Sequence, residues 1–208
     1  MRAPFVTLEG IEGSGKTTQI RLLSEYLTAR GIPHVATREP GGTPLADEIR
    51  RLLLSPREET VFPETELLLY EAARAQHVHA VILPALSAGN AVLSDRFFDA
   101  TSVYQGFSRG IDDAQIEGLN SFASGGLVPD LTFLFDIDPE NGFRRLYGRG
   151  VKPDRMESET MEFHRKVREG YLRLQKGHPD RIVRIDGLPP ADEVFRHVRQ
   201  GVAARFGW

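Results

Sequence analysis

Five short runs of mainly apolar residues are spread along the chain, each of a length that suits a β-strand. Three of them, FVTLE at residues 5–9, AVLSD at residues 91–95 and LTFLFD at residues 131–136, carry apolar residues on both alternating faces. Such runs are typical of strands that helices cover on both sides. HVATR at residues 34–38 and RIVRID at residues 181–186 predict two further strands.

Segments with apolar positions at helical spacing lie between these runs. Ile20, Leu23 and Leu27, for example, are three or four residues apart, so they fall on one face of a helix. Pro84 should bend or end the longest helix, because proline lacks the N–H group that a helix interior uses. The predicted helices cover residues 16–31, 44–55, 62–89, 100–107, 112–124, 139–150, 159–177 and 191–206.

The alternation of strands and helices predicts one α/β domain over residues 1–208, with a five-stranded parallel sheet and helices on both faces. Ligands of such sheets bind beyond the carboxyl ends of the strands. The residues at these ends are Glu9, Arg38 with Glu39, Asp95 with Arg96, and Asp136. We therefore expect the functional site at this edge of the sheet, with Asp136 outside its chemistry.

Composition narrows the class of protein. The net charge of the 208 residues is −3, which gives no general affinity for polyanions, so we expect no nucleic-acid partner. Cysteine is absent, which excludes disulfides and thiolate metal sites. No apolar run reaches the roughly 18 residues that span a membrane, and no signal-peptide pattern opens the sequence. We expect a cytoplasmic protein without a membrane partner.

A glycine-rich loop follows the first predicted strand. Residues 10–17 fit the pattern G-x-x-x-x-G-K-[ST], in which backbone N–H groups and the next helix N-terminus surround a phosphate. Lys16 can reach the β- and γ-phosphates, and the Thr17 hydroxyl can bind Mg²⁺. The loop therefore predicts a nucleoside triphosphate site, most simply for ATP. Its candidate residues are Gly10, Ile11, Glu12, Gly13, Ser14, Gly15, Lys16, Thr17 and Thr18.

The reaction is indicated by the Asp95-Arg96 pair after the third strand. The sequence lacks the N-K-x-D motif of GTPase switches, and its strand does not end in the Asp-Glu of motor ATPases. Asp95 can position Mg²⁺ through water, and Arg96 suits a second phosphate group. The pair favours transfer between two bound phosphates, with a structural surface ion pair as the alternative.

Four further segments resemble the successive motifs of bacterial thymidylate kinases, also called dTMP kinases. They are TREPGGTPLADEIR, LLLYEAARAQH, SDRFFDATSVYQG and GRGVKPDRMESE, and with the glycine loop they run from residue 5 to about residue 160. The resemblance implies a P-loop kinase fold with a short lid at about residues 148–157. It also implies transfer of the γ-phosphate of ATP to dTMP, giving dTDP and ADP in dTTP biosynthesis, by a Mg²⁺-dependent homodimer.

The resemblance also implies a dTMP site. It places Glu39 of the REPGG motif near the sugar and phosphate, and Arg50 and Arg96 at the monophosphate. Tyr70 takes the position of a Phe that stacks on thymine, and Arg74, one helical turn on, should share its helix face. The remaining matches are Thr101 and Gln105 at the base edge and Tyr104 beside the deoxyribose.

Glu12 stands where many relatives carry a basic residue. The chain is therefore similar to the subclass whose catalytic arginine comes from the lid, and on this interpretation Glu12→Arg would restore part of the rate of a lid variant. Aligned on Asp154-Arg155, this lid is one residue longer than the common form, so Arg149 and Arg155 are both candidates. We favour Arg149, with Lys16, Arg96 and Arg149 compensating phosphate charge.

Two other functions remain open from the residues. One is a nucleoside-monophosphate kinase for a different base, which Arg74, Thr101, Tyr104 and Gln105 disfavour. The other is a non-enzymatic ATP-dependent switch, which would bind ATP, hydrolyse it slowly and use no acceptor.

Overall fold

The computed structural model describes residues 2–148, 150 and 153–208. Its centre is a five-stranded sheet in which every neighbouring pair is parallel, with the order β2-β3-β1-β4-β5. The predicted parallel α/β sheet is confirmed. The strands are β1 Phe5–Glu9, β2 His34–Arg38, β3 Ala91–Asp95, β4 Leu131–Asp136 and β5 Ile182–Asp186.

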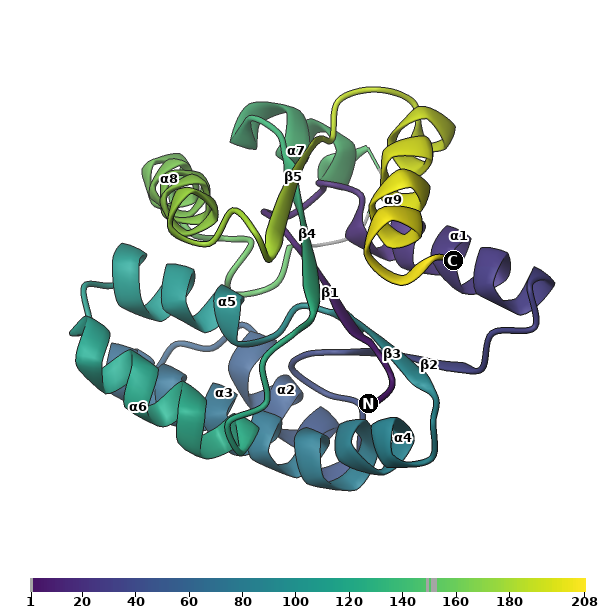
Figure 1. Cartoon of the computed structure of the whole chain (residues 1–208). Helices are drawn as coiled ribbons and strands as arrows, with labels where there is room; N and C mark the ends of the chain where they lie inside the picture. The colour runs from purple at the N-terminus through teal and green to yellow at the C-terminus, as the bar shows by residue number, and fades with distance from the viewer. Residues whose placement is uncertain (1, 149, 151–152) are drawn as a thin grey trace.

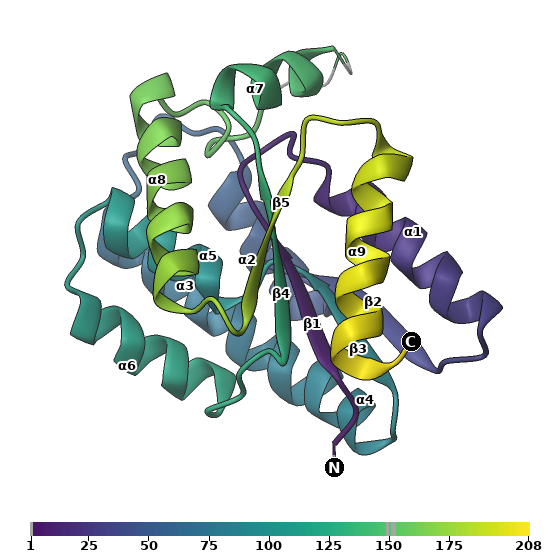
Figure 2. The same ribbon diagram turned by 45° about the horizontal axis from the view of Figure 1, so that its top comes forward.

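Helices cover both faces of the sheet (Figure 1). Helices α1 and α9 lie on one face, whereas α4 and α8 pack on the other (Figure 2). The helices are α1 Lys16–Ala29, α2 Pro44–Leu54, α3 Pro63–His77, α4 Leu83–Ser87, α5 Phe98–Thr101, α6 Asp113–Ser124, α7 Pro139–Tyr147, α8 Met161–Gly177 and α9 Ala191–Phe206, with π-helical segments η1 Val78–Ile82 and η2 Ser102–Ser108. In the part of the chain that the structure describes, no helix combines the length and apolar composition needed to cross a bilayer.

Apolar stripes fix α1 and α9 against the sheet. Leu23 and Leu27 of α1 are fully buried, as their spacing predicts, and they join one core with Val194, Val198 and Val202 of α9. The four-residue intervals place these side chains on one face of each helix. Burial of side chains of this kind stabilises the fold by about 1.5–3 kcal/mol each. The packing holds the N-terminus of α1 at the end of β1.

The long predicted helix over residues 62–89 is interrupted. Helix α3 ends at His77, the π-helical η1 follows, and α4 begins at Leu83. Pro84 cannot donate to the carbonyl of Ala80, and its ring would crowd that group. The π-helical η1 ends at Ile82, two residues before the proline. Residues 98–108 likewise begin as α-helix and continue as the π-helical η2, a distinction that apolar spacing does not reveal.

The parallel strands bring their carboxyl ends to one edge, as expected. Glu9, Arg38, Asp95 and Asp136 are the last residues of β1, β2, β3 and β4. Asp136 is engaged in ion pairs with arginines from α8 and β5, Arg168 at 2.7 Å and Arg184 at 2.6 Å. Burial raises the pKa of Asp136, but hydrogen bonds from the two arginines outweigh it and lower that pKa below its usual range. Its role is structural.

Candidate active site

Three glycines give the loop between β1 and α1 its shape. Gly10, Gly13 and Gly15 have φ values of 139°, 71° and 100°, in a region that other residues rarely adopt. A Cβ atom on Gly13 would lie 2.1 Å from the carbonyl oxygen of Gly142, so α7 packs directly on the loop backbone. The loop can therefore turn its backbone N–H groups inward at the N-terminus of α1.

Lys16 reaches back over this loop. Its ammonium donates hydrogen bonds to the carbonyl oxygens of Gly10 at 3.0 Å and Ile11 at 2.9 Å. The side chain is nearly buried, and burial, followed by the neighbouring charge of Arg96, lowers the pKa of Lys16 to about 8. Asp95 opposes this shift. Lys16 is thus placed at the phosphate-binding loop with its charge favoured below about pH 8.

Two oxygen donors meet beside the loop. The Thr17 hydroxyl donates to Asp95 Oδ2 at 3.0 Å, joining the start of α1 to the end of β3. Among the described residues no group of three or more His, Cys, Asp or Glu side chains could hold a metal alone. A hydroxyl and one carboxylate nevertheless fit Mg²⁺, which usually keeps several waters and binds substrate phosphates.

Arg96 has an unusual backbone. Its φ is 72°, a left-handed conformation that costs a non-glycine residue about 1–3 kcal/mol. Neighbouring groups hold it there: Arg96 N–H donates to the Leu8 carbonyl at 3.0 Å, and the Ser94 hydroxyl donates to the Arg96 carbonyl at 2.7 Å. The chain turns sharply after β3 and directs the guanidinium toward the loop.

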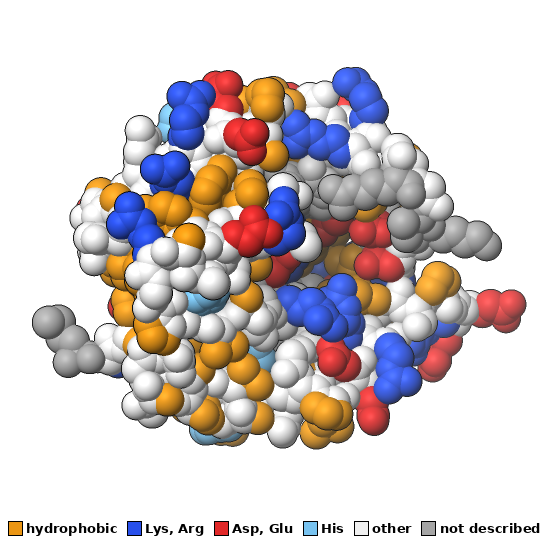
Figure 3. All heavy atoms as spheres, turned by 90° about the vertical axis from the view of Figure 1, so that its right-hand side faces the viewer, with side chains coloured by type: hydrophobic (Ala, Val, Ile, Leu, Met, Phe, Trp, Pro, Cys, Tyr) orange, Lys and Arg blue, Asp and Glu red, His pale blue; other side chains and the backbone are white. Residues whose placement is uncertain are grey.

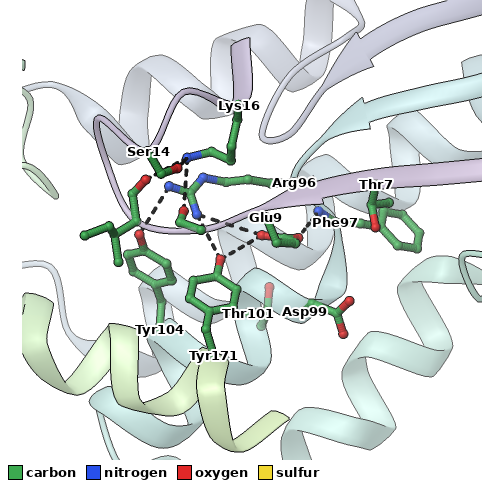
Figure 4. A network of polar contacts seen from close by, with 12 residues as sticks. Thr7, Glu9, Ser14, Lys16, Arg96, Phe97, Asp99, Thr101, Tyr104 and Tyr171 are labelled. Carbon is green, nitrogen blue, oxygen red and sulfur yellow. Dashed lines mark hydrogen bonds and ion pairs between the residues drawn. The ribbon is translucent and has the colours of Figure 1, made fainter. Parts of the chain in front are cut away.

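The Arg96 guanidinium is held by a polar network (Figure 4). Its Nη2 donates to Glu12 Oε1 at 2.8 Å and to the Tyr104 hydroxyl at 3.2 Å, and its Nη1 donates to the Tyr171 hydroxyl at 3.0 Å. The guanidinium also lies 5.0 Å from the centre of the Tyr104 ring, a cation–π distance. Arg96 is therefore fixed in position before any phosphate is bound.

Glu12 is part of this network. Besides Arg96, its carboxylate accepts a 2.6 Å hydrogen bond from the Tyr104 hydroxyl. Burial raises the pKa of Glu12, but the His164 ring and the charges of Arg96 and Lys16 outweigh burial and lower that pKa well below its usual range. Glu12 is one of the loop residues that the sequence assigns to ATP, and its side chain joins the loop to Arg96 and Tyr104.

Arg74 lies at the other end of the site and is almost completely buried. It donates to Glu39 at 2.9 Å, Glu71 at 2.6 Å, Asn120 at 3.0 Å and Thr101 at 3.0 Å. Burial lowers the pKa of Arg74, but the charges of Glu39 and Glu71 reverse the effect and raise it. The guanidinium is therefore a fixed cation.

One cleft of about 470 Å³ joins the loop to Arg74. Tyr70 and Arg74 both line it, as their shared helix face predicts, and so do Thr101 and Gln105. Figure 3 shows one face of the molecule hollowed, with acidic and basic side chains gathered around the hollow. The predicted site residues that line the cleft are Glu12, Lys16, Thr17, Glu39, Arg50, Tyr70, Arg74, Asp95, Arg96, Thr101, Tyr104 and Gln105, with Gly13 of the loop.

Of the two candidate lid arginines, the structure describes the contacts of Arg155 alone. Arg149 lies outside the described residues. Arg155 Nε donates to the Leu53 carbonyl at 2.7 Å, and Arg155 Nη2 pairs with Glu66 at 2.7 Å. Arg155 does not line the cleft. Its contacts with Leu53 and Glu66 fasten the base of the lid to α2 and α3.

Sequence patterns missed several residues that support the site. Tyr171 and His164 were recognised only as part of a helix, yet Tyr171 binds Arg96, and His164 Nδ1 lies 3.5 Å from Glu12 Oε2. Asn120 and Glu71, which hold Arg74, were also missed. The sequence feature that could have identified these four residues is a polar side chain on the buried face of an amphipathic helix.

A family profile and two relatives that match this sequence are all described as thymidylate kinases. A family profile described as thymidylate kinase matches residues 8–198. A thymidylate kinase from Carboxydothermus hydrogenoformans is 51% identical over 199 residues, covering 96% of each chain. One from Geobacter sp. (strain M21) is 52% identical over 206 residues, covering 97% of this chain and 92% of the relative.

Solved structures agree. The crystal structure of thymidylate kinase from Ehrlichia chaffeensis matches with a TM-score of 0.79 and 34% identity, covering 96% of this chain and 98% of that one. The P-loop, Arg96 and the cleft that both line are thus found in a chain that matches this family over nearly its whole length. The protein belongs to the thymidylate kinase family.

Proposed function

We propose that this protein transfers the γ-phosphate of ATP to dTMP, giving dTDP and ADP, a step toward dTTP. The observation that carries the proposal is that one cleft is lined by the P-loop residues Lys16 and Thr17, by Arg96 and by the buried Arg74. Family membership supports the same reaction.

The acceptor end of the cleft suits a pyrimidine deoxynucleotide. Arg74 and Gln105 supply donors to a base edge, and the ring of Tyr70 offers a face for stacking. The Tyr104 hydroxyl donates to Glu12. The resemblance to thymidylate kinases puts its ring beside the deoxyribose, where its bulk would disfavour a 2′-hydroxyl. Glu39 is buried and paired with Arg74, so its role is to hold that arginine at the acceptor end.

The transfer step needs positioning and charge compensation more than covalent chemistry. The dTMP phosphate is itself the nucleophile, so no strong general base is required. Lys16, Arg50 and Arg96 line the cleft. In this proposal Lys16 and Arg96 compensate charge on the transferring group and Arg50 on the acceptor phosphate, while the role given to Arg149, which lies outside the described residues, rests on the resemblance alone. Thr17 and Asp95 would hold Mg²⁺, which neutralises charge on the phosphates when it is bound.

We also propose a homodimer, supported by exposed apolar side chains. Leu45 and Leu52 on α2, Leu68 on α3 and Phe122 on α6 are all more than half exposed, and α3 packs against both α2 and α6. Sedimentation velocity should give a dimer that Leu52→Glu converts to monomer, whereas Val128→Glu, outside these helices, should leave it intact. A monomeric wild type would contradict the proposal. The cytoplasmic location and the absence of a nucleic-acid partner stay predictions.

Acceptor choice tests the function. ADP release should be measured with Mg-ATP and, separately, dTMP, dUMP, UMP, CMP, AMP and GMP. We expect the highest kcat/KM with dTMP. A higher value with AMP or CMP would assign a different monophosphate kinase, and slow ADP release that no acceptor stimulates would indicate a non-enzymatic switch.

A further inference from the structure

Glu9 and Tyr171 hold Arg96 through a second set of contacts, in addition to those made by Glu12 and Tyr104. Glu9 is the last residue of β1 and Tyr171 lies on α8, 162 residues away in the sequence. Their oxygen atoms are 2.7 Å apart, and both side chains are almost completely buried. Figure 4 shows the two side chains meeting on the side of Arg96 away from Lys16.

The direction of each hydrogen bond in this group follows from its chemistry. Arg96 Nη1 can only donate, so the Tyr171 oxygen accepts its 3.0 Å bond. The single Tyr171 hydrogen is then free to go to Glu9 Oε2. The other Glu9 oxygen accepts from the Phe97 N–H at 2.8 Å. Both Glu9 oxygens therefore act as acceptors, the arrangement that an ionised carboxylate makes.

A proton on Glu9 disturbs this arrangement. If Glu9 Oε2–H donates to Tyr171, the Tyr171 hydrogen can no longer go to Glu9, and the hydroxyl oxygen must accept from both Glu9 and Arg96. The bond to Arg96 is weakened because Tyr171 no longer donates to a carboxylate. The ion pair between Glu9 and Arg96, whose closest atoms are 4.0 Å apart, is lost. The protonation state of Glu9 thus affects the position of Arg96 through the Tyr171 hydroxyl.

We propose that Tyr171 and Glu9 are a positioning pair for Arg96, which makes the rate of phosphate transfer depend on the protonation of Glu9. Neither Glu9 nor Tyr171 lines the cleft. The proposal rests on the role of Arg96 in the proposed kinase reaction and adds a proton-linked control to it.

The groups around Glu9 determine the pH range in which its protonation changes. Burial raises the pKa of Glu9 to about 7, Arg96 opposes that shift, and Asp99 adds to it. The titratable and charged groups that face Glu9 are Arg96 and Asp99 after β3, Tyr171 on α8, Lys16 on α1 and Arg181 before β5. Raising the pH through 7 ionises Glu9 and completes the support of Arg96.

The test is Tyr171→Phe, which removes only the hydroxyl and keeps the buried ring. At pH 8 we expect kcat to fall about 10- to 100-fold, the equivalent of one hydrogen bond to a charged group, with the KM for ATP within twofold. The matched control is Tyr26→Phe, whose ring packs on Phe195 of α9 far from the cleft and which should keep wild-type kcat. Circular dichroism verifies that each variant is folded.

The pH profile separates positioning from a purely structural role. The ratio of wild-type to Tyr171→Phe kcat should be large at pH 8 and about five- to tenfold smaller at pH 6, because most wild-type molecules lose the same support when Glu9 is protonated. Ionisation of the nucleotides cancels in this ratio. Glu9→Gln should behave in the same way. A ratio that stays near one, or one that is large but constant with pH, would overturn the proposal.

Arg96→Ala identifies which claim has failed. If Arg96→Ala is severely impaired while Tyr171→Phe is normal, only the positioning pair is wrong. If Arg96→Ala keeps wild-type kcat, the role of Arg96 in transfer fails, and the positioning pair fails with it.

Discussion

At the scale of single residues, Lys16 is the clearest test of the loop. Among the residues that the structure describes, its ammonium bonds only to loop groups, so Lys16→Ala should leave the fold intact. We expect kcat to fall far more than tenfold, because the charge that meets the transferring phosphate is lost. Steady-state assays with saturating ATP and dTMP measure this. A loss smaller than tenfold, about 1.4 kcal/mol, would contradict a transition-state role.

Arg74 combines a binding role with a structural one. Arg74→Ala should raise the KM for dTMP about 10- to 100-fold and that for ATP much less, because only the acceptor end loses its donor. It should also destabilise the protein by about 3–5 kcal/mol, because Glu39 and Glu71 are left buried without their partner.

Urea unfolding monitored by circular dichroism gives the stability of the Arg74 variants. Arg74→Lys is the control, since it keeps the charge and loses the fork of donors. Equal increases in the KM of both nucleotides would instead make Arg74 part of the general scaffold.

At the scale of elements, we expect different roles for Arg149 and Arg155, the two lid arginines that the sequence left as alternatives. Arg149→Ala should lower kcat sharply and change ATP binding little, because a lid arginine engages fully only on closure. Arg155→Ala should instead lower stability, since Arg155 ties the lid base to Glu66 and the Leu53 carbonyl. Single-turnover rates and thermal unfolding distinguish them, and the reverse pattern would move the catalytic role to Arg155.

Glu12→Arg now has a different expected outcome. The sequence alone suggested that this change would restore rate to a lid variant. In the structure Glu12 holds Arg96 and Tyr104, so an arginine there would face Arg96 with like charge. We expect Arg149→Ala with Glu12→Arg to be slower than Arg149→Ala alone.

The elements also show how far sequence reasoning extends. The strand LTFLFD and the glycine loop were located by short-range patterns, because apolar runs and loop glycines are local constraints. Pro84 predicted a bend or an end in the helix over residues 62–89, but the π-helical geometry of η1 and η2 was not predicted, since it depends on how the turns pack. The Glu9–Tyr171 contact was also missed, because its residues are 162 positions apart and only the fold brings them together.

At the scale of the whole molecule, Glu9 links function to stability. Its pKa rises from 4.5 to about 7 on folding because it is buried, so between these values the folded state binds more protons than the unfolded chain. Glu9 therefore makes the protein less stable as the pH rises from 4.5 to 7, by at most about 3 kcal/mol. Thermal unfolding should show Glu9→Gln gaining stability relative to wild type from pH 5 to pH 8. No change in the difference would contradict a buried, titrating Glu9.

The central claim is that one cleft binds ATP and dTMP together and passes a phosphate between them. The most direct measurement follows the label of γ-³²P-ATP in a single turnover with excess enzyme and dTMP. We predict that the label appears in dTDP, with little released as inorganic phosphate, because the P-loop residues and the acceptor-side residues line the same cleft. Label recovered mainly as inorganic phosphate, at a rate that dTMP does not change, would contradict the account.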